Sequence, residues 1–246
     1  MRTVVLGTGC RARSVATTTA PPALTRRRML RAATTVVALA VLVGCAGGTG
    51  WNSSAASPAT TGLGTRTDLV MVIRHGEKPD DSHSGVDANG NEDDSSLTEI
   101  GWERARRLVD LFDPAQGRPR PGLARPTAIY AAGANDDGEG ARTRETVTPL
   151  ADQLGITVNT SFGKGEEKEL VEHALGQAGP TLIAWQHGEI PTIAAAFPGV
   201  TPAPPSEWPD DRYDVVWTFT RTADGWHFAQ LPELVLPQDR SAPIDD

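Results

Sequence analysis

Apolar runs and amphipathic segments alternate along the chain after residue 66. The run Leu69–Ile73 is continuously apolar between Asp68 and Arg74, and residues 181–186 form a second such run. Continuous apolar runs of this length predict strands that are buried on both faces. Apolar residues at helical spacing predict a helix that begins with Ser96 as its N-cap and Glu99 in a capping box. Further elements are predicted as strands at 127–131 and 156–158 and as helices at 142–154, 166–175 and 193–197.

This order of elements predicts an α/β fold. Strands that alternate with helices form a mostly parallel sheet with helices on both faces. Near the end of the chain, residues 213–218 and 226–230 flank the turn sequence Thr222–Gly225. This arrangement is typical of an antiparallel hairpin, so we expect a C-terminal β-hairpin at one side of the sheet.

The first 44 residues differ in composition from the rest. They contain seven arginines and no acidic residue, and the first carboxylate is Asp68. A basic flank ending at Arg31 precedes a 12-residue apolar stretch at 32–43, which is too short to span a bilayer and suits a signal peptide. The segment 25–31, with its run of arginines, resembles a twin-arginine export signal.

A lipid anchor is predicted at the end of this segment. Leu42-Val43-Gly44-Cys45 resembles the lipobox of bacterial lipoproteins, in which the cysteine receives lipid. We therefore expect an exported protein, held by lipid on Cys45 at the outer face of the cell membrane. Cys10 and Cys45 are the two cysteines of the sequence, so cleavage before Cys45 would leave no intramolecular disulfide.

The composition of the successive segments predicts the domain organisation, and the net charge excludes one class of partner. Residues 1–44 are predicted as the signal peptide, 45–66 as a flexible tether, 67–238 as the folded domain and 239–246 as a tail. Without the leader, 16 basic residues face 31 acidic ones, a net charge of −15. This charge argues against a nucleic-acid partner held by phosphate contacts.

Polar residues follow several predicted strands directly. Arg74-His75-Gly76 ends the first strand, Arg142 follows the second, and Gln186-His187-Gly188 ends the strand at 181–186. Ligands bind at the carboxyl edge of an open α/β sheet, so these groups should meet there. Guanidinium groups fit phosphoryl oxygens, and a neutral imidazole is a competent nucleophile toward phosphorus. The set therefore predicts phosphoryl transfer from a phosphorylated small molecule or phosphopeptide.

These residues resemble the signatures of the histidine phosphatase superfamily, which includes phosphoglycerate mutase-like enzymes. Arg74-His75-Gly76 resembles its R-H-G motif, residues 97–101 its L-T-x-x-G helix start, Arg142 with Thr146 its R-x-x-x-T segment, and His187 its second histidine. The resemblance implies a three-layer α/β sandwich and a phosphohistidine intermediate, with no metal and no cofactor. It implies that His75 is the nucleophile and that Arg74, Arg142 and His187 form the phosphate pocket.

The sequence departs from the family pattern at two places that bear on the site. Ala131 stands where the family usually has Ser, and Arg142 lies twelve residues after Tyr130 rather than about six, so Arg144 remains an alternative. The general acid is also open. Glu189, two residues after His187, is favoured, and Glu166 and Glu167 are the alternatives.

Three functions are compatible with these observations. The favoured one is an exported, membrane-anchored, metal-independent phosphatase that hydrolyses phosphomonoesters. A phosphoglycerate mutase-like phosphotransferase fits the same residues, although export argues against sugar-phosphate metabolism. A non-catalytic phospho-ligand-binding lipoprotein would not need a nucleophile at His75.

Overall fold

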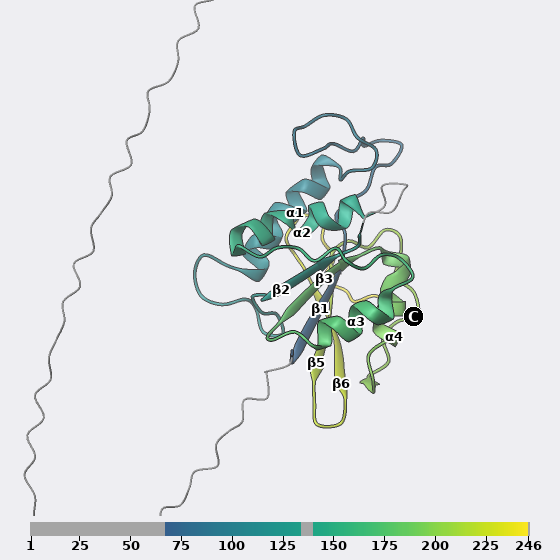
Figure 1. Cartoon of the computed structure of the whole chain (residues 1–246). Coiled ribbons are helices and arrows are strands. Elements are labelled where there is room, and N and C mark those ends of the chain that lie inside the picture. The colour runs from purple at the N-terminus through teal and green to yellow at the C-terminus, as the bar shows by residue number, and fades with distance from the viewer. Residues whose placement is uncertain (1–66, 134–139, 246) are drawn as a thin grey trace, which may run out of the picture. The chain divides into compact units, whose positions relative to one another are not determined.

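The computed structural model describes residues 67–133 and 140–245 of the chain. Residues 1–66, which contain the predicted signal peptide, Cys45 and the tether, lie outside the described residues. So do residues 134–139, between Tyr130 and Arg142. The described residues form a six-stranded sheet in the order β2-β3-β1-β5-β6-β4 (Figure 1). Its strands are β1 (Leu69–Arg74), β2 (Ala128–Ala131), β3 (Thr181–Trp185), β4 (Val200–Thr201), β5 (Val215–Arg221) and β6 (Trp226–Pro232).

The predicted α/β class and C-terminal hairpin are confirmed. β1 and β2 both pair in parallel with β3, and β4 pairs in parallel with β6. β5 is antiparallel to β1 and β6. The hairpin closes where the amide of Thr222 donates to the carbonyl oxygen of Gly225, at 2.8 Å.

Helices cover both faces of the sheet and make the third layer. α1 (Glu99–Phe112) and α2 (Ala141–Leu154) pack on one face. α3 (Glu167–Leu175) and α4 (Ile190–Ala195) pack on the other (Figure 1). A short 3₁₀ turn, His187–Glu189, joins β3 to α4.

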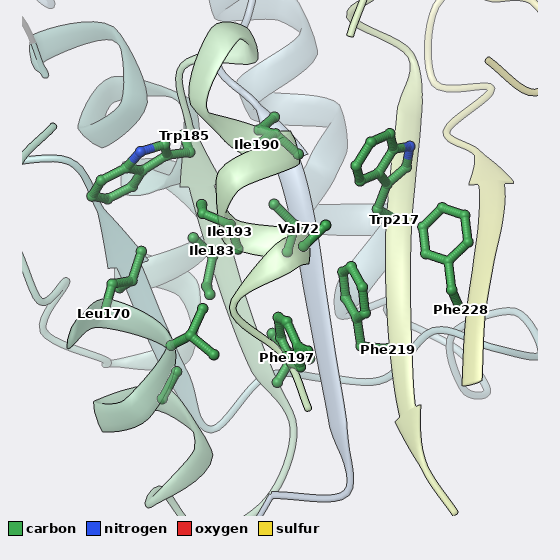
Figure 2. Close-up of a cluster of buried hydrophobic side chains, with 14 of the residues drawn as sticks. Val72, Leu170, Ile183, Trp185, Ile190, Ile193, Phe197, Trp217, Phe219 and Phe228 are labelled. Atoms are coloured by element: carbon green, nitrogen blue, oxygen red, sulfur yellow. The ribbon is translucent and has the colours of Figure 1, made fainter. Parts of the chain in front are cut away.

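Strand β1 shows why the sheet requires helices on both faces. Met71 and Ile73 point into the core beneath α1 and α2, whereas Val70 and Val72 belong to the opposite core. Figure 2 shows Val72 in that second core, among aromatic side chains of β5 and β6. All four side chains are fully buried, as the continuous apolar run predicts. Each contributes on the order of 1.5–3 kcal/mol by leaving water.

Two local predictions are wrong. Thr98, not Ser96, caps α1, and its hydroxyl accepts from the amide of Gly101. The Ser96 hydroxyl instead bonds the Glu145 carboxylate of α2, at 2.7 Å. The predicted strand at 156–158 is reduced to a single bridge between Asn159 and Tyr130, because the segment contacts only the edge of β2 there.

The C-terminal residues belong to the domain rather than to a tail. The side chain of Ile244 is 3% exposed in the core, and the backbone oxygen of Ile244 accepts from the side-chain amide of Gln230. The Asp239 carboxylate pairs with the buried Arg104 of α1 at 2.7 Å. These contacts extend the folded unit at least to Ile244. Within the described ranges, no helix has the length and apolarity needed to cross a bilayer.

Candidate active site

The two predicted histidines follow neighbouring parallel strands. β1 and β3 align so that Arg74 lies opposite Trp185. The amide of His75 continues the ladder by donating to the carbonyl oxygen of Trp185, at 3.1 Å. His187 lies two residues beyond Trp185, so the sheet register brings both histidines to the same carboxyl edge.

The hydrogen bonds of His75 define its tautomer. The Nδ1 atom lies 2.7 Å from the carbonyl oxygen of Gly76. A carbonyl oxygen can only accept, so Nδ1 carries the hydrogen and Nε2 keeps its lone pair. Burial, and then the positive charge of Arg74, lowers the pKa of His75 from 6.5 to about 3. The ring is therefore neutral at physiological pH, as a nucleophile must be.

Gly76 ties β1 to α1 and α2. A Cβ atom at Gly76 would lie 2.9 Å from the carbonyl oxygen of Gly101, so a side chain there would force the backbones apart. The amide of Gly76 donates to the hydroxyl of Thr146 at 2.7 Å, and that hydroxyl donates to the carbonyl oxygen of Arg142. The space beside Gly76 is therefore filled by the backbone of Gly101.

Arg142 lies in the first turn of α2, near His75. Its charge is one of the influences that lower the pKa of His75. The guanidinium Nη1 donates to the carbonyl oxygens of Asp94 and Ser95, both at 3.3 Å. Arg144 is exposed to solvent. Of the two predicted alternatives, Arg142 therefore lies close enough to act on His75, whereas Arg144 points to solvent.

The guanidinium of Arg74 is fully buried and mainly holds backbone. Its Nη1 donates to the carbonyl oxygens of Pro209, Asp210 and Arg212, at 3.2, 2.6 and 3.1 Å. Its Nη2 donates to the hydroxyl of Tyr213, whose ring centroid lies 3.8 Å from the guanidinium carbon. The Nε atom has no partner within the described residues. Arg74 thus fixes the segment 209–213 beside the histidines while keeping its positive charge there.

A carboxylate that the sequence analysis missed reaches the same place. Asp210 Oδ1 lies 2.9 Å from His187 Nε2, 3.2 Å from Lys78 Nζ and 3.6 Å from Arg74 Nη2. The hydrogen bond from Lys78, together with the nearby His187, lowers the pKa of Asp210. Burial lowers the pKa of His187, and its Nδ1 is buried without a partner among the described residues.

The acids named from the sequence are engaged elsewhere. The carboxylate of Glu189, which lies two residues after His187, pairs with Lys164 at 3.2 Å. Glu166 accepts from the amide of Gly163. Glu167 is buried and accepts from the indole nitrogen of Trp185 at 3.1 Å, so it supports the fold.

Glu77, the residue after Gly76, belongs to a cluster of ion pairs around Arg104. Its carboxylate accepts from Arg104 at 2.8 Å, and Arg104 also binds Glu233 and Asp239, both at 2.7 Å. One buried guanidinium thus joins the residue after the histidine motif to α1 and to the C-terminal segment. Burial raises the pKa of Glu233 from 4.5 to about 8.

Neither Asp210 nor Tyr213 could be found from a motif, because both lie in the connection before β5. The bonds from Arg74 help to bring this connection back to the end of β1. Lys78 and Tyr213 also line a cavity of about 370 Å³ next to this cluster. In the part of the chain that the structure describes, no group of three or more His, Cys, Asp or Glu side chains is arranged to hold a metal ion.

Comparison with solved structures gives matches at low identity. The SixA protein of Agrobacterium tumefaciens, provisionally described as a phosphohistidine phosphatase, is 17% identical with a TM-score of 0.41, over 67% of this chain and 96% of that one. A mycobacterial glucosyl-3-phosphoglycerate phosphatase is 14% identical with a TM-score of 0.40, over 66% and 96%. YhfR of Bacillus stearothermophilus is 17% identical with a TM-score of 0.37, over 66% and 95%.

No protein-family model matches the chain, and no curated protein matches it. The functional argument therefore depends on the geometry of this chain's own residues.

Proposed function

We propose that this chain is a phosphatase that hydrolyses phosphomonoesters through a phosphohistidine at His75. The observation that carries the proposal is the state of that ring. It is buried and neutral, its Nδ1 hydrogen is held by the carbonyl oxygen of Gly76, and its Nε2 is left as the nucleophilic nitrogen. A histidine that served only packing would not require positive groups around it, yet Arg74 and Arg142 both act on this ring.

The first step is attack of His75 Nε2 on phosphorus. The P–N bond forms as the ester P–O bond breaks, and the imidazole becomes positively charged. The Gly76 carbonyl oxygen stabilises that charge through the Nδ1 hydrogen. In the second step water attacks phosphorus, the P–N bond breaks, and the electron pair returns to Nε2.

Arg142 and His187 are proposed to hold the phosphoryl oxygens. Phosphoryl transfer depends mainly on positioning and on neutralising charge, and fixed cationic donors supply both. No step of this scheme uses a metal ion, so we propose that the activity is metal-independent.

We also propose that the enzyme is exported and anchored by lipid on Cys45. The support is in the sequence: an arginine-rich flank, a short apolar stretch and a lipobox-like segment that ends in Cys45. Fractionation of cells that express the full chain tests this proposal. The wild-type chain is expected in the membrane fraction, and Cys45→Ala is expected to leave that fraction. Equal membrane recovery of both chains would exclude the anchor.

The test of the activity is phosphate release from 4-nitrophenyl phosphate by the purified protein. We expect turnover that EDTA does not reduce and that His75→Ala lowers by at least about 10⁴-fold. His227→Ala is the matched control, because His227 is exposed on β6. Equal turnover by the wild type and His75→Ala would refute the assignment. Tight phosphate binding without turnover would instead support a binding protein.

A further inference from the structure

Asp210 differs from the other carboxylates near the candidate active site. Among the described residues discussed above, it is the one in direct contact with His187, and it also contacts Lys78. Glu189, the acid favoured from the sequence, is paired with Lys164. We propose that Asp210 is the acid–base residue of this site, an inference that rests on the proposed phosphatase function.

The backbone of Asp210 is fixed while its carboxylate is free to move. Arg74 binds the carbonyl oxygens of Pro209, Asp210 and Arg212, so the segment cannot drift from the end of β1. The side chain of Asp210 is nevertheless 72% exposed, and its contacts are with the polar groups of Lys78, His187 and Arg74, for which an incoming anion can compete. A fixed backbone with a mobile carboxylate is suited to proton transfer at a defined place.

An incoming phosphoryl group must compete with Asp210 for the same donor. Asp210 Oδ1 lies 2.9 Å from His187 Nε2, so it occupies the place where the hydrogen of that nitrogen would meet a phosphoryl oxygen. That hydrogen cannot serve the carboxylate and a phosphoryl oxygen at once. Substrate binding therefore displaces the Asp210 carboxylate from His187 by one side-chain rotation, which leaves it next to the bound ester.

The same displacement prepares Asp210 to carry a proton. In the free protein Lys78 and His187 lower the pKa of Asp210, so the carboxylate is ionised. Once a phosphoryl dianion takes those partners, the carboxylate loses its cations and gains a negative neighbour. Both changes raise its proton affinity, and its exposure lets it take a proton from solvent.

The proton balance over the two steps is complete. As His75 Nε2 bonds to phosphorus and the P–O bond breaks, Asp210 gives its proton to the leaving oxygen and the neutral alcohol departs. The Asp210 carboxylate then takes a proton from the attacking water as the P–N bond breaks. When phosphate leaves, Asp210 gives this proton back to solvent and returns to His187 as a carboxylate.

The experiment compares two substrates whose leaving groups differ in basicity. For Asp210→Asn and the wild type, kcat/KM is measured with an alkyl phosphate and with 4-nitrophenyl phosphate. Loss of a general acid should lower kcat/KM for the alkyl phosphate by about 10²–10⁴-fold. The nitrophenolate leaves without a proton, so kcat/KM for its ester should fall by less than about tenfold. The variant should also release a burst of nitrophenol, because the phosphoenzyme then lacks its base.

Two further variants complete the design. Asp211→Asn is the matched control, since Asp211 is the next residue, has a side chain that is 74% exposed and pairs with Arg240. It should leave both kcat/KM values unchanged. Glu189→Gln tests the acid favoured from the sequence, and a selective loss on the alkyl phosphate in that variant would assign the role to Glu189 and overturn the proposal.

The remaining outcomes are also decisive. An equal fall on both substrates in Asp210→Asn would make Asp210 a positioning residue, and an equal rise would make it only a competing anion. Either result overturns the proposal. If the wild type and His75→Ala hydrolyse both substrates at the same rate, the proposed phosphatase function itself fails. This result differs from a failure of the Asp210 proposal, in which the wild type still shows turnover that depends on His75.

Discussion

Two buried arginines contact the segment His75–Glu77: Arg74 precedes it, and Arg104 pairs with Glu77. They differ in the groups to which they donate. Arg74 donates to three carbonyl oxygens and a tyrosine hydroxyl, and its nearest carboxylate oxygen is 3.6 Å away on the exposed Asp210. Arg104 binds three carboxylates, those of Glu77, Glu233 and Asp239.

The difference appears in the pKa of each side chain. Burial lowers the pKa of Arg74. In Arg104 burial acts in the same direction, but the charge of Glu233 and the hydrogen bond to Glu77 outweigh it and raise the pKa. The positive charge of Arg74 can therefore act on His75 and on an incoming anion, whereas the charge of Arg104 is neutralised by its carboxylate partners. Two arginines of similar burial thus have different roles, one at the site and one in its support.

Arg104→Ala would have the largest effect on stability. The substitution removes the buried partner that Glu77, Glu233 and Asp239 share, which should lower the free energy of unfolding by about 3–5 kcal/mol. Denaturant unfolding measures this change. Arg106→Ala on the same helix is the control, because Arg106 pairs with Glu103 in solvent and should cost less than about 1 kcal/mol. Similar losses for both variants would show that the cluster around Arg104 is not a supporting element.

Arg74→Lys should instead affect activity. A lysine cannot reach three carbonyl oxygens and Tyr213 together, so the segment that carries Asp210 would loosen and the charge beside His75 would shift. We expect kcat/KM for 4-nitrophenyl phosphate to fall by about 10²–10³-fold. Far-ultraviolet circular dichroism checks that the variant is folded. Full activity in a folded Arg74→Lys protein would contradict the role assigned to this arginine.

Thr146→Val tests the uncharged hydrogen bond that joins β1 to α2, from the amide of Gly76 to the hydroxyl of Thr146. Valine keeps the shape but leaves the buried amide of Gly76 without its acceptor. The expected loss is about 1–3 kcal/mol in the free energy of unfolding. Thr148→Val is the control, because the Thr148 hydroxyl bonds only the carbonyl oxygen of Arg144 on the outer side of α2. Equal stabilities of the two variants would argue against this tie.

Glu233→Gln gives the smallest effect at neutral pH and tests the charge balance around Arg104. The pKa of Glu233 is raised from 4.5 to about 8 by burial, so in this window the native carboxyl keeps a proton that the unfolded chain has lost. The contribution of Glu233 to stability is thus present below pH 4.5 and is lost as pH rises toward 8. Thermal unfolding across this range should show a steeper decline for the wild type than for Glu233→Gln. Parallel profiles would contradict the raised pKa.

The sheet and the nucleophile side of the site could be predicted because local patterns determine them. The apolar run before Arg74 and the run before Gln186 each define a buried strand, and parallel pairing then brings His75 and His187 to one edge. The spacing of Arg142 and Thr146 places both on one side of α2, since residues four apart lie on the same side of a helix, but the bond from Gly76 to Thr146 became visible only in the structure.

The opposite side of the site could not be predicted, since it depends on contacts between residues far apart in the chain. Asp210 lies 136 positions from Arg74, the residue that holds its backbone. Glu233 and Asp239 reach Arg104 across a similar separation. No periodicity or short motif encodes such contacts. The sequence therefore could not place the connection before β5, and it predicted residues 239–246 as a tail.

Chemical trapping of the intermediate shows whether His75 carries the phosphoryl group. The protein is mixed with a ³²P-labelled phosphomonoester, quenched within the first turnover and digested, and the labelled peptide is sequenced by mass spectrometry. The account predicts one label on the imidazole of His75, labile in acid and stable in alkali, that is absent from His75→Ala. An acid-stable label on another side chain, or turnover that continues in His75→Ala, would contradict it.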